Sequence, residues 1–192
     1  MYYNLKSYIS AFKCDPISAF GGIVSCNFII NKKVAIELNK IFLEVIIANG
    51  YQSDALKILK RKKNLRIIDA KNLKLNENKN FVSNLDTFLY QSTDNKNFDK
   101  KNFKIVSKKK PTSNQFKDLI FAFNVSRYVK SNAIVLANNL STIGIGSGQP
   151  SRLDSCEIAI NKMNKGELSS LENIVAASDA FFPFVDGVEK LV

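Results

Sequence analysis

The sequence contains no histidine among its 192 residues and only three cysteines. Without histidine, the chain lacks the commonest general base and a frequent metal ligand. Cys14, Cys26 and Cys156 are widely spaced and form no C-x-x-C pair, so neither a disulfide framework nor a zinc ribbon is expected. This cysteine usage is typical of reduced thiols in a cytoplasmic protein that holds no metal. No apolar run approaches the roughly 20 residues that span a bilayer, and no signal-peptide layout is present, so we expect no membrane association.

Acidic residues are also scarce, 17 against 28 lysines and arginines, which gives a net charge of +11. Most of the lysines are scattered, and the two clusters, 60–63 and 108–110, adjoin predicted element ends, which is typical of a solvated surface. A basic RNA-binding module without catalysis is the alternative function, and it predicts affinity that falls steeply with salt. The aromatic residues lie in apolar periodic elements rather than among the lysines, so no nucleic-acid partner is expected.

The first third of the chain alternates between helical and extended patterns. The expected elements are a helix over 2–13, a strand over 23–30, a helix capped by Asn31 that ends near Glu44, a strand over 45–48, a helix capped by Ser53, and a strand over 65–68. This β-α-β-α-β order predicts an α/β fold with some parallel strand pairing. At 45% hydrophobic content, the chain is long enough to bury a core.

Polar, low-complexity stretches predict a boundary between two lobes somewhere within residues 71–110. We expect a surface loop over 69–80 and a strand over 84–91. The first lobe is therefore placed at about 1–90 and the second at about 91–192. Thr112 and Gln115 form a capping box that opens a helix in the second lobe.

The stretch from Lys130 to Leu153 predicts two short strands, over 133–137 and 142–145, followed by a glycine-rich loop and a helix that begins near Arg152. Such a loop presents backbone N–H groups and a positive helix end, which favours an anionic or carbonyl-rich ligand. The glycines Gly144, Gly146 and Gly148 match neither G-x-G-x-x-G nor a P-loop, so a dinucleotide or nucleoside triphosphate is not expected.

Two other segments carry a structural and a functional interpretation that the sequence alone leaves open. The segment AASDAFFPFVDGV, residues 176–188, is either a core plug or an aromatic wall for a planar heterocycle with an adjacent carboxylate. Gly21 and Gly22 either permit an unusual turn or let a ligand approach the backbone. Glu44, at the mouth of an apolar strand, is either a surface residue or an acceptor for ligand hydroxyls.

Three separated segments, DPISAFGGIV (15–24), SNAIV with TIGIGSGQPSRL (131–153) and SDAFFPFVDG (178–187), together resemble one family. They are similar to the transformylase domain of the bifunctional formyltransferase and IMP cyclohydrolase of purine biosynthesis. That domain transfers a formyl group from 10-formyltetrahydrofolate to the 5-amino group of aminoimidazolecarboxamide ribonucleotide (AICAR). The resemblance covers essentially the whole chain, and it implies a cytidine-deaminase-like fold with two lobes and mixed sheets flanked by helices.

The resemblance also implies roles for individual residues. It assigns AICAR binding to Gly21, Glu44, Asn132, Arg152 and Phe181, with Asn132 at the reacting end. It assigns folate binding to Leu153 and Asp186. It further implies a homodimer with sites built across the subunit interface, and no zinc.

The sequence departs from the family pattern in four places. The Lys-His pair that the family places just before the position of Met1 is absent, as is the cyclohydrolase domain, and the closing segment of the fold is missing. Val185 stands where an arginine is usual. We therefore expect a fold that is incomplete at both ends and a chain that is a fragment of the enzyme, inactive when isolated.

Overall fold

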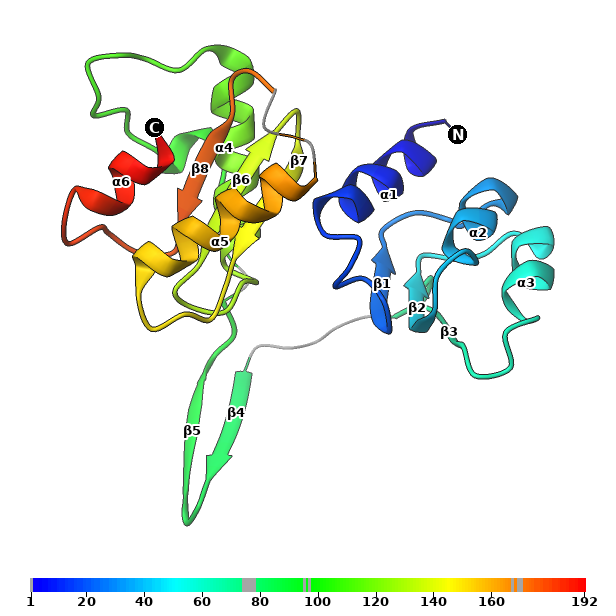
Figure 1. Cartoon of the computed structure of the whole chain (residues 1–192). Helices are drawn as coiled ribbons and strands as arrows, with labels where there is room; N and C mark the ends of the chain where they lie inside the picture. The colour runs from blue at the N-terminus through cyan, green and yellow to red at the C-terminus, as the bar shows by residue number, and fades with distance from the viewer. Residues whose placement is uncertain (1, 74–78, 95, 97, 167, 169–170) are drawn as a thin grey trace.

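The computed structural model describes residues 2–73, 79–94, 96, 98–166, 168 and 171–192 (Figure 1). The helices are α1 (Tyr2–Cys14), α2 (Lys32–Leu38), α3 (Ser53–Leu59), α4 (Ser113–Ser126), α5 (Arg152–Lys165) and α6 (Asp186–Leu191), with a 3₁₀ turn at Lys100–Asn102. The strands are β1 (Gly22–Cys26), β2 (Leu43–Ala48), β3 (Arg66–Asp69), β4 (Lys79–Asn84), β5 (Thr87–Ser92), β6 (Ile134–Asn138), β7 (Ser141–Gly146) and β8 (Val175–Ser178). Within these residues, no helix is both long and apolar enough to cross a bilayer.

The strands form one parallel sheet and two antiparallel sheets. The parallel sheet has the order β1-β2-β3, and its core includes residues from α2 and α3. The second three-stranded sheet has the order β7-β6-β8 and is antiparallel, while β4 and β5 form a separate hairpin. This arrangement confirms the prediction of an α/β fold with mixed sheets flanked by helices. Figure 1 shows the two three-stranded sheets apart, with α1 between them.

The central strand β6 is buried on both faces, because a helix covers each side. Val135 and Ala137 belong to the core that α4 closes, whereas Ile134 and Leu136 belong to the core that α5 closes. The alternation of strand side chains thus divides one apolar run between two cores. The expected strands 133–137 and 142–145 are confirmed as the hairpin β6–β7.

The β6–β7 turn depends on a buried carboxylate. Asn139 and Leu140 both have positive φ, 50° and 56°, which is unfavourable for leucine. The Asp118 carboxylate accepts hydrogen bonds from the backbone N–H groups of Asn139 at 3.0 Å and Leu140 at 2.7 Å. A side chain of α4 therefore fixes the turn that aligns β6 with β7.

Several expected boundaries are confirmed and others are wrong. Asn31 caps α2, and the capping box of Thr112 and Gln115 opens α4. However, α2 ends at Leu38 rather than near Glu44, because Leu43 already pairs with Gly22 in the parallel sheet. The side chain of Ser53 does not cap α3, whose N-cap is Gln52.

The expected single strand over 84–91 is wrong, because the chain reverses within it. Leu85 takes a φ of 50°, and β4 pairs with β5 on either side of the turn. Part of the expected loop over 69–80 is also strand, since β4 begins at Lys79; residues 74–78 of that loop lie outside the described part of the chain. The proposed lobe boundary within 71–110 stays a prediction.

Candidate functional site

A hollow of about 400 Å³ lies between the start of α5 and the segment that leads from β8 into α6. Five of the seven residues to which the resemblance gave a role line it: Asn132, Arg152, Leu153, Phe181 and Asp186. They come from segments up to 54 residues apart in sequence, and the fold brings them together at one end of the β7-β6-β8 sheet.

The guanidinium of Arg152 makes three hydrogen bonds to neighbouring side chains. Its Nη1 donates to the Ser178 hydroxyl at 2.7 Å and to the Asp179 carboxylate at 2.5 Å, and its Nη2 donates to Asn132 Oδ1 at 2.7 Å. The guanidinium also lies 5.9 Å from the centre of the Phe182 ring. Only 12% of the side chain is exposed, although the residue lines the hollow. These three bonds use three of the five N–H donors of a guanidinium, so the group can hold the site together and also bind a ligand.

The Asn132 amide connects Arg152 to the loop before α5. Its Nδ2 donates to the carbonyl oxygens of Gln149 and Pro150, both at 2.9 Å, while its Oδ1 accepts from Arg152. The backbone carbonyl of Asn132 accepts from the buried Ser155 hydroxyl at 2.8 Å. Asn132 is therefore held in place on its side chain and on its backbone.

Asp179 lies behind Arg152 and does not line the hollow. Its carboxylate accepts from the Ser131 hydroxyl at 2.5 Å, from the Ala133 backbone N–H at 3.1 Å and from Arg152. Burial on its own raises the pKa of the Asp179 carboxyl, but these hydrogen bonds outweigh burial and leave the pKa below its usual value. The carboxylate is thus ionised at neutral pH.

The three phenylalanines of the segment 181–184 differ in burial, which decides the core-plug interpretation for each, whereas the aromatic wall for a heterocycle stays a prediction. Phe182 packs into the core beneath α5, and a Cβ on Gly187 would lie 2.6 Å from its ring. Phe181 and Phe184 are 80% and 72% exposed and line the hollow. The core-plug interpretation is therefore right for Phe182 and wrong for Phe181 and Phe184.

The remaining lining residues frame the two sides of the hollow. Leu153 is in the first turn of α5, where its backbone N–H donates to the Ser151 cap at 3.2 Å. Asp186 begins α6 and accepts from the Gly187 backbone N–H at 2.7 Å. Val185, which follows Phe184, is 69% exposed beside it.

The expectation that three glycines present bare backbone to an anion is wrong for Gly144 and Gly146. Both lie in β7 under α5, where a Cβ would come within 2.2 Å of the Ala159 carbonyl oxygen and 1.8 Å of the Ser155 carbonyl oxygen, respectively. Only Gly148 lies in the loop, with a φ of 71°, and its N–H donates to the Lys130 carbonyl. The glycines of β7 allow a helix to approach the sheet closely.

Gly21 and Glu44 do not join the other five residues. Gly21 takes a φ of 70° just before β1, where its N–H donates to the Phe42 carbonyl at 2.9 Å. Glu44 lies within β2, exposed, and is 3.7 Å from Arg66 of β3. Neither residue lines the hollow, because the first sheet stands apart from the second (Figure 1).

Sequence reasoning did not identify β8 or the role of the residues at its end. Val175–Ser178 pairs with β6 and places Ser178 and Asp179 against Arg152. The local sequence signal for β8 is weak: it consists of four β-branched or small residues, 174–177, followed by Ser178 and Asp179. Among the residues described here, no group of three or more His, Cys, Asp or Glu side chains could hold a metal ion.

Comparison with known proteins identifies relatives of the chain. The family model described as AICARFT/IMPCHase bienzyme matches residues 3–162. The bifunctional purine biosynthesis protein PurH of Fusobacterium nucleatum is 45% identical over 183 residues, 95% of this chain and 35% of the relative. The PurH proteins of Clostridium acetobutylicum and Buchnera aphidicola are 46% and 42% identical over 97% of this chain, which covers 35% and 36% of their lengths.

The chain thus spans about a third of the length of these relatives, and nearly all of this chain takes part in each match. The matched region of the family model covers most of the chain, including Asn132, Arg152 and Leu153. On this evidence, the chain belongs to the AICARFT/IMPCHase bienzyme family.

Proposed function

We propose that the chain binds AICAR in the hollow at the start of α5 and belongs to the formyltransferase part of the bienzyme. In that reaction, the formyl group of 10-formyltetrahydrofolate passes to the 5-amino group of AICAR, giving formyl-AICAR in the late steps of purine biosynthesis. The observation that carries the proposal is the 2.7 Å hydrogen bond between Arg152 and Asn132 at the wall of a hollow that Phe181, Leu153 and Asp186 also line.

The hollow suits a charged, planar substrate. Arg152 supplies a positive charge, and the exposed Phe181 and Phe184 rings supply faces on which an imidazole ring can stack. The Asp186 carboxylate can accept N–H groups of the folate ring system, and Leu153 contributes apolar contact on the same side. The 5-amino group of AICAR is a poor nucleophile because its lone pair is delocalised, so alignment of both substrates is a large part of catalysis.

The chain's own residues supply binding and orientation. Asp186 is the one carboxylate among the described lining residues. The resemblance implies that it binds folate and not that it transfers a proton. The base for the departing amine proton is assigned by the resemblance to a Lys-His pair that this sequence does not contain. Binding is therefore the property of this chain to test first.

Calorimetric titration of the chain with AICAR is the direct test. We expect saturable binding, and we expect ribose 5-phosphate, which lacks the heterocycle, to bind at least about tenfold more weakly because it loses the stacking contacts. Equal affinity for the two ligands, or no heat with either, would refute the AICAR site.

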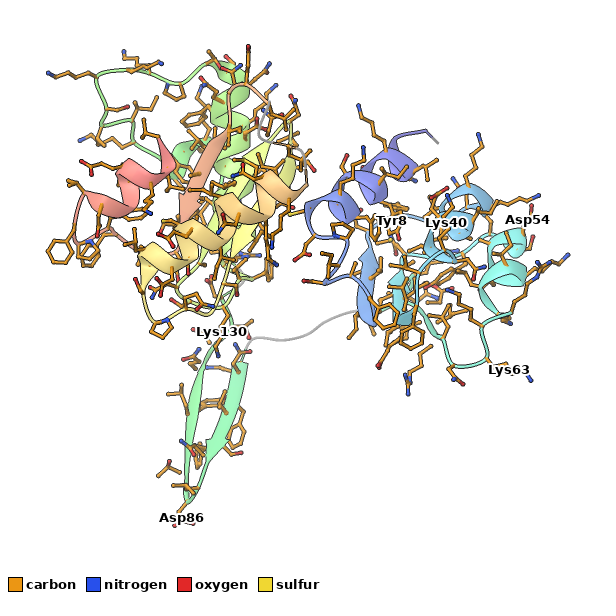
Figure 2. The ribbon with its side chains drawn as sticks, in the orientation of Figure 1. Tyr8, Lys40, Asp54, Lys63, Asp86 and Lys130 are labelled. Atoms are coloured by element: carbon orange, nitrogen blue, oxygen red, sulfur yellow. The ribbon has the colours of Figure 1, made fainter. Side chains whose placement is uncertain are left out.

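We further propose that the chain acts as a homodimer, with β4–β5 as part of the contact surface. This hairpin projects from the body of the molecule, with Asp86 at its tip (Figure 2). Its side chains are exposed on both faces, including Phe81 and Tyr90 on one and Val82 and Leu89 on the other, at 57% to 63%. A two-stranded hairpin is marginally stable alone in water, so a partner surface must stabilise it.

Charge favours a second copy of the chain as that partner. Lys79 and Asp86 are the charged residues of β4, β5 and their turn, so the hairpin is neutral on a chain of net charge +11. Free edge strands of monomeric proteins usually carry lysine or proline, which prevents pairing, and between Asn80 and Ser92 neither occurs. A twofold axis can pair such an edge with itself. In the dimer, Gly21 and Glu44 of the partner subunit would complete the AICAR site.

Substitution of Leu89 by lysine should dissociate this dimer. Analytical ultracentrifugation should show the wild type at twice the chain mass of 21.5 kDa and Leu89→Lys at the mass of one chain, because a lysine desolvated at the interface is unfavourable. Val106→Lys, which adds the same charge at a side chain 86% exposed outside the hairpin, is the control and should remain dimeric. A monomeric wild type would contradict the proposal, as would a dimeric Leu89→Lys variant.

A further inference from the structure

Asp179 joins three segments of the second sheet at one carboxylate. The residue follows β8, and its carboxylate contacts Ser131 and Ala133 at the entrance to β6 and Arg152 at the start of α5. Its backbone N–H also donates to the Ala133 carbonyl at 3.3 Å. Four hydrogen bonds therefore fix the position of Asp179 before any ligand binds.

Arg152 is restrained by its neighbours in turn. Asp179 and Ser178 hold Nη1, and Asn132 holds Nη2, so both terminal nitrogens of the guanidinium have protein partners. An arginine side chain has several rotatable bonds. If the side chain were unrestrained, ligand binding would have to order these bonds. A guanidinium that is already ordered avoids most of that entropic loss, which is the usual gain from preorganisation.

The strength of the restraint depends on charge. Hydrogen bonds between a guanidinium and a carboxylate are roughly twice as strong as neutral ones. Asp179 is 19% exposed and Arg152 is 12% exposed, so water screens the pair only in part. The Ser178 and Asn132 side chains, which are neutral, would hold the guanidinium less firmly without it.

We propose that Asp179 is a positioning residue whose ionised carboxylate orients Arg152 toward the hollow, so that AICAR meets a preformed cation. The inference rests on the proposed function, because it takes AICAR as the ligand. Asp179 itself does not line the hollow and would act through Arg152 alone.

The guanidinium of Arg152 gives a readout that does not depend on ligand. In NMR spectra of the wild type we expect separate, slowly exchanging Nη proton signals for Arg152, and in Asp179→Asn we expect these signals to broaden or average. Asp154→Asn removes the same charge from an exposed residue two positions after Arg152 and should leave the signals unchanged. Unchanged Arg152 signals in Asp179→Asn would overturn the inference.

Calorimetry supplies the second readout. We expect Asp179→Asn to bind AICAR about tenfold more weakly than the wild type, with Asp154→Asn within about twofold. The double variant Arg152→Ala, Asp179→Asn should bind no more weakly than Arg152→Ala alone, because Asp179 acts only through Arg152. Additive losses would show a general structural role and overturn the inference.

A milder substitution covers the case in which Asp179→Asn fails to fold. Ser131→Ala removes the hydroxyl that holds the carboxylate but keeps its charge, and it should broaden the Arg152 signals and weaken AICAR binding by about threefold. Ser131→Ala with wild-type signals would also overturn the inference. A wild type that binds no AICAR would refute the proposed function, while the Arg152 signals would still decide the role of Asp179.

Discussion

Replacing Gly146 with alanine should destabilise the chain by about 3 kcal/mol or more, toward the upper end of what overpacking a core does. The added Cβ would lie 1.8 Å from the Ser155 carbonyl oxygen and 2.6 Å from its carbonyl carbon. Both are backbone atoms of α5, so no side-chain rotation relieves the clash, and the helix must move away from the sheet. Urea denaturation followed by circular dichroism measures the loss.

Gly148→Ala is the matched control for this substitution, two residues along the chain. Its Cβ would meet only the flexible Lys130 side chain, at 3.6 Å, so the loss comes from the positive φ of 71° and should be about 1–2 kcal/mol. If Gly146→Ala proved no less stable than Gly148→Ala, the close packing of α5 on β7 would be incorrect.

The same clash should also change the geometry of the candidate site. Ser155 provides both the carbonyl that covers Gly146 and the hydroxyl that donates to the Asn132 carbonyl. A shift of α5 would therefore move Asn132 relative to Arg152. This connection explains why the glycine-rich segment matters to the site although Gly144 and Gly146 do not face the hollow.

The second large effect is expected at Arg152, where Arg152→Gln should weaken AICAR binding by about 100-fold. Hydrogen bonds to a charged group contribute about 1.5–3 kcal/mol, and 2.7 kcal/mol corresponds to about 100-fold. Glutamine keeps much of the length of the side chain, which limits the loss of packing beside Phe182. Calorimetric titration with AICAR measures the change.

Arg61→Gln provides the control for charge. It removes one positive charge from an exposed position just after α3, outside the residues that line the hollow, and should leave AICAR affinity within about twofold. Equal affinities of Arg152→Gln and the wild type would show that AICAR does not bind at the start of α5.

Local signals in the sequence were sufficient for much of the fold. The Asn31 cap, the capping box at Thr112 and the apolar runs of β6 and β7 depend on neighbouring residues, and the structure confirms each. Where tertiary pairing decides, local signals failed. Glu44 continues a helical pattern but lies in β2, because pairing with β1 begins one residue earlier, at Leu43.

The sequence indicated five of the residues that line the hollow, but not the geometry that brings them together. Motifs far apart in sequence contributed Asn132, Arg152 and Phe181, and the structure brings them to one hollow. The glycines of β7 were misinterpreted, because a glycine that admits a helix and one that admits a ligand look alike in sequence. The role proposed for Asp179 depends on the position of β8, which only the structure shows.

An NMR titration of the isotope-labelled chain with AICAR tests the central claim most directly, because it locates the ligand. We predict that the largest backbone shifts fall at residues 132, 150–153 and 180–187, around the hollow that Arg152 and Phe181 line. Shifts confined to the hairpin β4–β5 or to the β6–β7 turn, with those residues unmoved, would contradict the account.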